Sequence, residues 1–403
     1  MKKQLNLKEI FADYIKNKKI FKNKNALTIQ FTPENILHRE EQIKQLGMIL
    51  APVLKEEKPS NIFIYGKPGT GKSLCIRYVT NVLLNEAIEH NIDNLKIIYV
   101  NCRMHKVADT EYRLLSQVLY NFNINVPYTG LPTDELYRTF FNVIQSNPLN
   151  ILLILDEIDY LVNKIGDNIL YNLTRINEKL SKSKLTIIGI SNNSTFINNL
   201  DPRVKSSLSE EEIIFPSYNA NELKDILIDR IEIAFHPDTV TPQAIAKCAA
   251  LAAQEHGDAR KALDLIRVAG EIAERSGDNK VTEKHVDMAE KKLDIDKTFE
   301  ILKTQPRQSQ IVYFAIIKLI ERGAKNILTG DVYDEYIKAC ERNGIRALTQ
   351  RRVSDLISEL EMIGMINCKV ISLGRYGRTR EIRINMPKTV FEKIKRFLEK
   401  EFI

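Results

Sequence analysis

The stretch Asn61-Ile-Phe-Ile-Tyr-Gly66-Lys-Pro-Gly-Thr-Gly-Lys72-Ser73 decides the fold. It opens with a β-branched and aromatic run that is typical of a buried strand. From Gly71 onward the pattern becomes helical, with one apolar side formed by Leu74, Val79, Val82 and Leu83. Residues 66–73 match a phosphate-binding loop, in which glycines let backbone N–H groups point at phosphate oxygens and the next helix presents its positive end. The stretch therefore predicts a nucleotide-binding protein.

Each residue of this loop has an expected role. Lys72 would reach the β- and γ-phosphates, and the Ser73 hydroxyl would hold Mg²⁺. Contacts with the nucleotide are expected along the whole loop, from Gly66, Lys67, Pro68, Gly69, Thr70, Gly71, Lys72, Ser73 and Leu74, and further along the chain from Tyr218 and Arg230.

Length and composition limit the classes that remain. A chain of 403 residues favours two or three domains, because single cores stop growing near about 250 residues. The longest apolar run, residues 311–317, is too short to cross a bilayer. The N-terminus lacks the apolar segment of a secretory signal peptide. The 5 cysteines are isolated and have no metal-ligand spacing. We therefore expect a cytoplasmic protein with reduced thiols and no membrane contact.

Positive charge is concentrated in the last hundred residues. Residues 301–403 hold 20 Lys and Arg against 12 Asp and Glu, whereas the whole chain has a net charge of +7. Such asymmetry indicates a polyanionic partner for this segment. A solubilising face would give the same imbalance, so charge alone leaves both interpretations open.

Beyond the loop, strand-like runs at residues 95–100, 150–155, 185–190 and 212–215 alternate with helical stretches. This alternation predicts a parallel sheet covered on both faces, with the ligand at the carboxyl ends of the strands. We expect three domains: 1–218, which starts with a basic, partly mobile leader of about 35 residues, an all-helical 219–298, and 299–403. The last domain has the order helix, helix, helix, hairpin, which is that of a winged helix.

Asp156 and Glu157 end the apolar run 151–155, where a nucleotide site needs carboxylates. In phosphoryl transfer the first acid holds Mg²⁺, directly or through water, and its neighbour activates the attacking water. We therefore assign Asp156 to the metal and Glu157 to the base, which makes ATP hydrolysis the expected reaction. Capping of the next helix by Asp156 or Asp159 is the alternative.

Three further polar residues are weaker candidates. Asn192 follows the strand at 185–190, where its amide would orient the attacking water or serve as ordinary turn chemistry. Arg260 starts a helix of the second domain and would reach the phosphates, although a solvated helix arginine has the same pattern. Arg203 would project to a neighbouring subunit.

Residues 349–363 predict the recognition helix of the winged helix. Val353, Leu356, Ile357, Leu360 and Ile363 form a buried stripe, and the opposite face carries Gln350, Arg351, Arg352, Ser354, Asp355 and Ser358. Arginine and glutamine are suited to base edges or phosphates in a major groove. A hairpin tip follows with Arg375, Tyr376, Gly377, Arg378 and Arg380, which fits a wing against phosphate or in a minor groove. A winged helix that docks protein is the alternative.

Taken in order, these motifs resemble the origin-recognition and cell-division-cycle (ORC/Cdc-type) replication initiators of archaea, a branch of the AAA+ ATPases. The resemblance rests on the phosphate loop, Asp156-Glu157, Ser191-Asn192-Asn193, the segments 200–208 and 257–263, and the terminal winged helix. It implies an α/β fold with an AAA+ P-loop parallel sheet, a helical lid domain and a C-terminal winged-helix domain.

The resemblance also implies function and further site residues. Such a protein would bind origin double-stranded DNA in its ATP or ADP form and help recruit an MCM-type replicative helicase. It would be a monomer in solution, associated with the nucleoid, that assembles on DNA with paralogous initiators. Asn192 and Arg260 would be the two sensors, and His38 and Arg39 would lie beside the adenine. A helical insertion within residues 104–131 would touch DNA beside the wing.

One departure concerns hydrolysis. Related subunits often have Ser-Arg where this chain has Ser206-Ser207, so Arg203 is only a candidate for an arginine acting in trans. We therefore expect weak ATPase activity that serves as a regulatory switch. Two other classes stay open on the residues alone: a signalling or regulatory ATPase whose winged helix docks protein or promoter DNA, and a clamp-loader or branch-migration motor.

Overall fold

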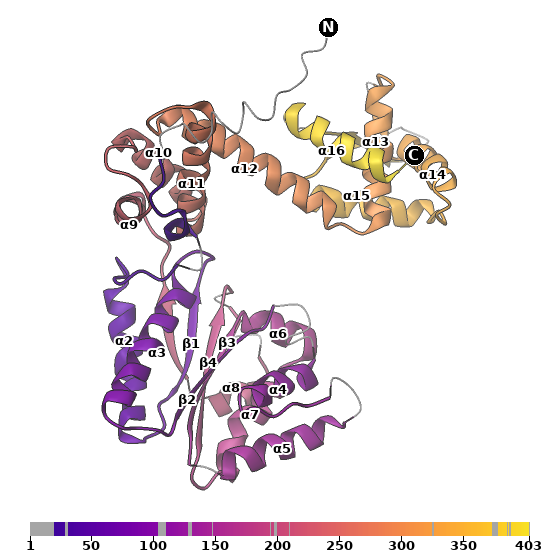
Figure 1. Ribbon diagram of the computed structural model, residues 1–403. Helices are drawn as coiled ribbons and strands as arrows, with labels where there is room; N and C mark the ends of the chain where they lie inside the picture. The colour runs from indigo at the N-terminus through magenta and orange to yellow at the C-terminus, as the bar shows by residue number, and fades with distance from the viewer. Residues whose placement is uncertain are drawn as a thin grey trace. The chain divides into compact units, whose positions relative to one another are not determined.

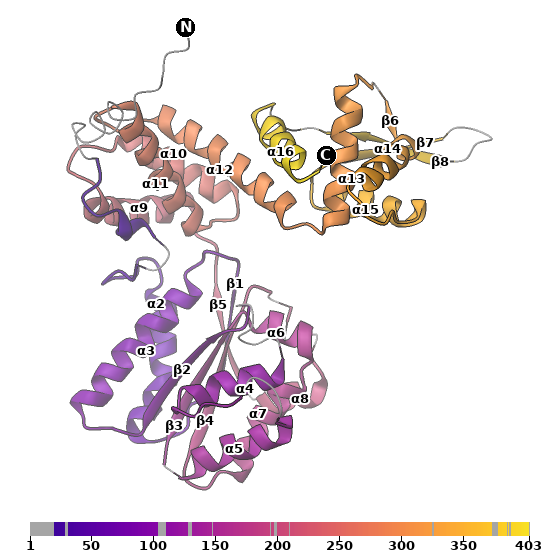
Figure 2. The same ribbon diagram turned by 45° about the vertical axis from the view of Figure 1, so that its right-hand side comes forward.

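The computed structural model has two compact units, residues 1–286 and 287–403, which are described separately (Figures 1 and 2). The structure describes residues 20–28, 31–103, 110–127, 131–146, 148–193, 195–196, 200–208, 210–324, 326–372, 378–384, 386 and 388–402.

The first unit is built on a parallel sheet of β1 (Asn61–Gly66), β2 (Leu95–Asn101), β3 (Asn150–Asp156), β4 (Lys184–Ser191) and β5 (Glu210–Phe215). Their order across the sheet is β2-β3-β4-β1-β5. Every residue of β3 is buried, because the strand is central and covered on both faces. The parallel sheet expected from the alternating pattern is confirmed.

Helices cover the two faces of this sheet (Figure 1). One face packs on α2 (Glu40–Leu50) and α3 (Lys72–Glu89), and the short helix η2 (Ala51–Lys55) follows α2. The other face packs on α4 (Glu111–Tyr120), α5 (Thr133–Ser146), α6 (Ile158–Ile165), α7 (Asn168–Lys179) and α8 (Pro202–Leu208). Successive strand residues alternate between the two cores: Ile62 and Ile64 enter one, and Phe63 and Tyr65 enter the other.

One detail of the predicted helices is wrong. Val82 was expected on the apolar side of α3, but it is 44% exposed. The helix presents its core face through Cys75, Ile76, Val79 and Leu83, and Val82 lies beyond the edge of that stripe. The insertion expected within residues 104–131 contains α4, so two helices, α4 and α5, connect β2 to β3.

The lid portion of the first unit contains α9 (Ala220–Ala234), α10 (Pro242–Gln254), α11 (Ala259–Ser276) and the start of α12 (Glu283–Lys303). Its helices begin at polar caps that satisfy free N–H groups. Asn219 and Glu222 form a capping box at α9, and Asp258 caps α11 by accepting from the Arg260 backbone N–H. Gly277, with φ of 74°, ends α11 in the left-handed region.

The expected mobile leader is a structured part of the lid over its described residues. The short helix η1 (Lys24–Leu27) packs on α9 and α11. The backbone N–H groups of Lys22 and Asn23 donate to the Ala234 carbonyl at 2.8 and 3.0 Å, and the Phe21 and Phe235 rings lie 4.6 Å apart. Lys24 also pairs with Glu271 of α11 at 2.6 Å. Residues 1–19 of the expected partly mobile leader lie outside the described residues.

The second unit has its own core. It contains α13 (Arg307–Glu321), β6 (Ile327–Leu328), α14 (Thr329–Arg342), α15 (Gln350–Met362), β7 (Asn367–Ser372), β8 (Arg378–Arg383) and α16 (Lys388–Glu401). The strands form an antiparallel sheet in the order β6-β8-β7. The winged-helix order is confirmed, with the added short strand β6. Of the expected buried stripe on α15, only Ile363 is wrong: it follows the last helical residue and is 38% exposed.

Helix α12 runs through residue 298. The domain boundaries expected at 218/219 and 298/299 both stay predictions. In the described part of the chain, no helix is both long and apolar enough to cross a membrane.

Gly270 leaves the space in which the Phe21 ring of the N-terminal segment packs on the lid. A Cβ at this position would lie 2.5 Å from Cζ of Phe21 and 3.0 Å from Cε1 of Phe235. We expect Gly270→Ala to displace the Phe21 ring, to speed tryptic cleavage after Lys22 and Lys24, and to cost about 1–3 kcal/mol through overpacking. Limited proteolysis and thermal unfolding would measure both effects.

Gly47→Ala is the matched control, because a Cβ on this α2 residue meets no atom within 4 Å. Equal cleavage rates in the two variants would contradict the docking role of Gly270.

Candidate functional site

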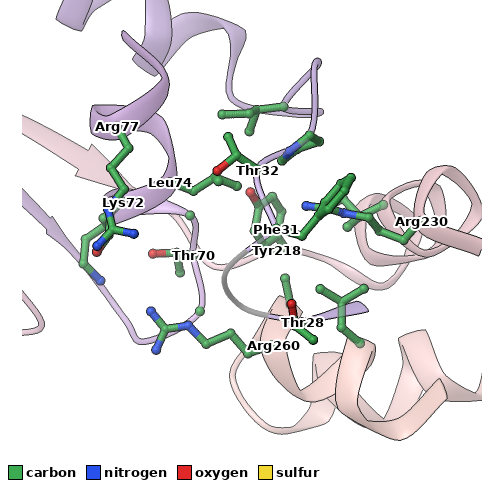
Figure 3. Close-up of a pocket in the computed structure, with 18 of the residues that line it drawn as sticks. Thr28, Phe31, Thr32, Thr70, Lys72, Leu74, Arg77, Tyr218, Arg230 and Arg260 are labelled. Carbon is green, nitrogen blue, oxygen red and sulfur yellow. The ribbon is translucent and has the colours of Figure 1, made fainter. Parts of the chain in front are cut away.

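A cavity of about 350 Å³ opens at the carboxyl ends of the central strands. Its wall contains Gly69, Thr70, Gly71, Lys72, Ser73 and Leu74 of the loop, Asp156, Glu157 and Asn192 after β3 and β4, and Tyr218, Arg230 and Arg260. Lys72 and Arg77 lie at one end of the cavity and Phe31 and Arg230 at the other, while Arg260 reaches in from α11 (Figure 3). The structure thus brings together most of the expected nucleotide-binding residues.

The loop needs glycine at two positions of its path. Gly69 and Gly71 have φ of 74° and 92°, in the left-handed region that side chains disfavour. A Cβ on Gly69 would also lie 1.7 Å from the Asp258 carboxylate. The loop and the lid are in direct contact here, since the Ala259 N–H donates to the Gly69 carbonyl at 3.2 Å.

Lys72 is buried at the phosphate end of the cavity. Its ammonium group donates to the Gly66 carbonyl at 2.6 Å, the Lys67 carbonyl at 2.8 Å and Oδ1 of Asn192 at 2.9 Å. Burial, together with repulsion from Arg260, lowers the pKa of Lys72 to about 8, although nearby carboxylates oppose the shift. An anion in the cavity would favour the charged form, which is the behaviour expected of a phosphate-binding lysine.

Asp156 lies beside the loop and is 5% exposed. Its Oδ2 accepts from the Ser73 hydroxyl at 2.8 Å and from the Tyr99 hydroxyl, and its Oδ1 accepts from the Glu157 N–H at 3.0 Å. The carboxylate faces the loop, and α6 begins without a side-chain cap, so the capping alternative for Asp156 fails.

These two oxygen donors suit a hard cation. A serine hydroxyl and a carboxylate are the protein ligands that Mg²⁺ uses when phosphate and water supply the other positions. Among the described residues, no group of three or more His, Cys, Asp or Glu side chains could hold a metal alone. The Ser73 hydroxyl and the Asp156 carboxylate fit Mg²⁺ by the chemistry of their oxygen atoms.

Glu157 adopts the left-handed conformation, with φ of 56° and ψ of 47°. Non-glycine residues are uncommon there, and such strain clusters at functional sites. The Glu157 side chain is 26% exposed, lines the cavity and pairs with Arg103 at 3.3 Å. This placement agrees with the expected base.

Arg260 brings positive charge from the lid. Within the described chain its guanidinium makes no ion pair, whereas the next residue, Lys261, pairs with Glu255 outside the cavity. A second contact between loop and lid joins Nζ of Lys67 to Nδ1 of His256 at 3.3 Å. Arg260 is thus a cavity cation that lacks a protein anion.

The residues expected beside the adenine make structural contacts outside the cavity, and their adenine role stays a prediction. Arg39 is 2% exposed and donates to the carbonyls of Thr70, His38 and Pro216 at 2.9, 2.7 and 2.6 Å. Its guanidinium stacks on the Tyr218 ring at 3.7 Å. Arg39 supports the loop from behind, and neither it nor His38, which contacts Asp225 of α9 at 3.0 Å, lines the cavity.

The structure adds cavity residues that sequence reasoning missed. Tyr99, Arg77, Leu27, Thr28 and Phe31 also line the cavity. Tyr99 precedes the end of a predicted strand, so alignment of strand ends was a usable signal for it. The N-terminal residues gave no signal, because their packing on the lid depends on distant contacts.

Arg203 lies away from this cavity. Its side chain is 81% exposed and pairs with Asp201 through two nitrogens at 3.1 Å. Its role in trans stays a prediction.

In the second unit, the exposed face of α15 carries the residues expected at DNA. Gln350 and Arg351 are exposed in its first turn, and Arg351 has no ion-pair partner among the described residues. Arg352 is held by Glu359 at 3.3 Å and Asp355 at 3.8 Å. Ser354 is half-buried, and Arg380 of β8 donates to the Ser358 hydroxyl. Arg375, Tyr376 and Gly377 lie outside the described residues, as does the side chain of Arg378.

Comparison with known proteins agrees with this architecture. Residues 55–192 match the family model described as AAA domain, residues 224–291 the Cdc6 AAA+ ATPase-type lid domain, and residues 300–394 the CDC6 C-terminal winged-helix domain. These matches define an AAA+ ATPase with a Cdc6-type lid and winged helix.

Relatives cover nearly the whole chain. An ORC1-type DNA replication protein of Pyrococcus abyssi is 52% identical over 387 residues, which is 95% of this chain and 91% of that protein. An ORC1-type DNA replication protein 1 of Methanosarcina mazei is 47% identical over 389 residues, which is 96% of this chain and 93% of the relative. A solved structure of the Aeropyrum pernix ORC1 protein in complex with DNA has a TM-score of 0.82 at 39% identity and covers 95% of this chain and 98% of that one. The chain belongs to the family of ORC1-type DNA replication proteins.

Arg260 allows a test of the cavity as an anion site. Because a hydrogen bond to a charged group is worth about 1.5–3 kcal/mol, we expect Arg260→Gln to weaken binding of a fluorescent ADP analogue by roughly 10- to 100-fold. Fluorescence anisotropy would measure the affinity. Lys261→Gln is the matched control, since its partner Glu255 lies outside the cavity. Equal losses in the two variants would exclude a direct contact from Arg260.

Proposed function

We propose that this chain is an origin-binding replication initiator whose affinity for DNA is regulated by bound ATP or ADP with Mg²⁺. The observation that carries the proposal is the convergence of Lys72, Asp156, Glu157 and Arg260 on one cavity next to the phosphate-binding loop. Membership of the ORC1-type family supports the choice of process.

The residues of the cavity would have different roles in binding and hydrolysis of the nucleotide. Lys72 would exchange its backbone acceptors for the β- and γ-phosphates, while the Gly69–Gly71 backbone cradles them. Ser73 and Asp156 would hold Mg²⁺, which neutralises phosphate charge when bound. Glu157 would accept a proton from the attacking water, and Asn192, which now accepts from Lys72, would orient that water.

We expect hydrolysis to be slow. The Glu157 carboxylate is engaged by Arg103, and Arg203 is engaged by Asp201. Slow turnover suits a switch, in which the bound nucleotide changes the contacts between loop and lid. Arg260, reaching from α11, is the residue through which the lid would respond to the phosphates.

The α15 face is the proposed DNA surface. Arg351 has no carboxylate partner among the described residues, and it lies in the first turn of the helix, the part that meets base edges or phosphates in helix-turn-helix proteins. The structure of the Aeropyrum pernix relative in complex with DNA supports DNA as the partner. Several finer points stay predictions. They are DNA contacts from the insertion, recruitment of the helicase, assembly with paralogues, and wing contacts from Arg375, Tyr376, Gly377, Arg378 and Arg380.

Glu157→Gln separates binding from chemistry. The amide keeps the shape of the side chain but does not accept a proton, so we expect ATP to bind with near-normal affinity and to remain unhydrolysed. Retention of radiolabelled ATP on the purified variant, with product analysis over time, would measure this.

Lys72→Ala is the comparison that should lose nucleotide binding altogether. Hydrolysis at the wild-type rate in Glu157→Gln would remove Glu157 from the mechanism, and tight binding by Lys72→Ala would refute the site.

Arg351 of α15, which has no ion-pair partner among the described residues, allows a test of the salt dependence of DNA binding. We expect Arg351→Ala to weaken duplex binding and to lower the dependence of log affinity on log salt by about one unit if Arg351 contacts a phosphate. Fluorescence anisotropy with labelled DNA at several salt concentrations would measure the slope. Arg396→Ala on α16, also exposed but outside the proposed surface, is the control. Equal behaviour of the two variants would locate the DNA surface elsewhere.

A further inference from the structure

Tyr99 makes a contact that no motif of the sequence explains. It lies on β2, two residues before the strand ends, opposite Ile154 of β3 in the parallel register. Its hydroxyl donates to Oδ2 of Asp156, the same oxygen that accepts from the Ser73 hydroxyl at 2.8 Å. Both hydroxyls therefore act on the carboxylate assigned to the metal.

Counting acceptors shows what this double contact does. A carboxylate offers about four acceptor positions, two on each oxygen. Tyr99 and Ser73 use both positions of Oδ2, and the Glu157 N–H uses one position of Oδ1 at 3.0 Å. With the contacts of the described residues counted, one acceptor position remains, and it lies on Oδ1. A cation, or its bound water, would have to be received there.

Tyr99 is itself held in place. The guanidinium of Arg77, one turn after Ser73 on α3, lies over the Tyr99 ring at 4.4 Å from the centroid. Both side chains line the same cavity, and Figure 3 shows Arg77 beside Lys72 at the phosphate end. The contact with Asp156 is thus fixed from the strand on one side and from the P-loop helix on the other.

We propose that Tyr99 is a positioning residue for magnesium binding. By occupying Oδ2 of Asp156 it prevents rotation of the carboxylate and leaves Oδ1 as the acceptor for the cation. The inference rests on the proposed nucleotide function and adds to it a partner for the metal carboxylate. Outer-shell partners of this kind change metal affinity by about 10- to 100-fold when they are removed.

A purely structural role would give a different result. If Tyr99 only satisfied a buried carboxylate, its removal would lower stability and weaken nucleotide binding to the same degree with and without magnesium. A positioning role changes the magnesium requirement alone. The magnesium dependence of binding therefore discriminates between the two.

The experiment uses the full chain with Tyr99→Phe and a fluorescent ADP analogue. Affinity is measured by anisotropy in EDTA and then at increasing Mg²⁺. We expect affinity in EDTA within about twofold of the wild type, and a half-saturating Mg²⁺ concentration about 10- to 100-fold higher. Thermal unfolding checks that the variant is folded.

Tyr78→Phe is the matched control. Tyr78 is half-buried on α3, and its hydroxyl has no hydrogen-bond partner in the described chain, so its magnesium requirement should equal that of the wild type. An unchanged requirement in Tyr99→Phe, or an equal loss in EDTA and in Mg²⁺, would overturn the proposal. If the wild type itself binds no nucleotide, or binds without regard to Mg²⁺, the proposed nucleotide function fails first, and that outcome is distinct.

Discussion

The register of the parallel sheet is the constraint on which the site depends. β3 pairs with β4 and β4 with β1, so Asp156, Ser191 and Gly66 all come to the same edge. A slip of one residue would turn every side chain of a strand to the other face. The register is fixed because both faces are buried: alternate residues of β1 and β3 enter separate cores. Hydrophobic packing thereby sets the distances between the phosphate loop and the carboxylates.

Much of the fold and part of the site could be predicted from sequence, because their signals are local. The loop with its strand and helix, the carboxylates at a strand end and the stripe on α15 each fall within a short window. Arg77 and the N-terminal segment could not be found this way, and for Tyr99 the usable signal was its place near a predicted strand end, which does not show its partner. Their roles depend on contacts across the chain, such as Phe21 with Phe235 and the Tyr99 hydroxyl with Asp156. Ile363 was misjudged because helix periodicity does not show where a helix ends.

The arginines around the nucleotide cavity have different tasks, which charge alone would not reveal. Arg39 donates to three carbonyls, and its guanidinium stacks on an aromatic ring, so Arg39 supports the loop. Arg230 is buried over the Phe31 ring at 4.7 Å. Arg260, in contrast, enters the cavity with no carboxylate partner in the described chain. The same contrast separates Arg351 from Arg352 on α15. In both regions the arginine that has no ion-pair partner in the described part of the chain is the one suited to an external anion.

The three hydrogen bonds of Lys72 have a consequence for how a ligand enters. With those bonds made, the ammonium group is already solvated by protein when no anion is present. Entry of a ligand is then a substitution of partners, and the affinity measures only the difference between two satisfied arrangements. A molecule with a single weakly charged oxygen offers little advantage over the carbonyls of Gly66 and Lys67. A ligand therefore needs enough negative charge near Lys72 to replace these acceptors, and phosphate oxygens supply that charge.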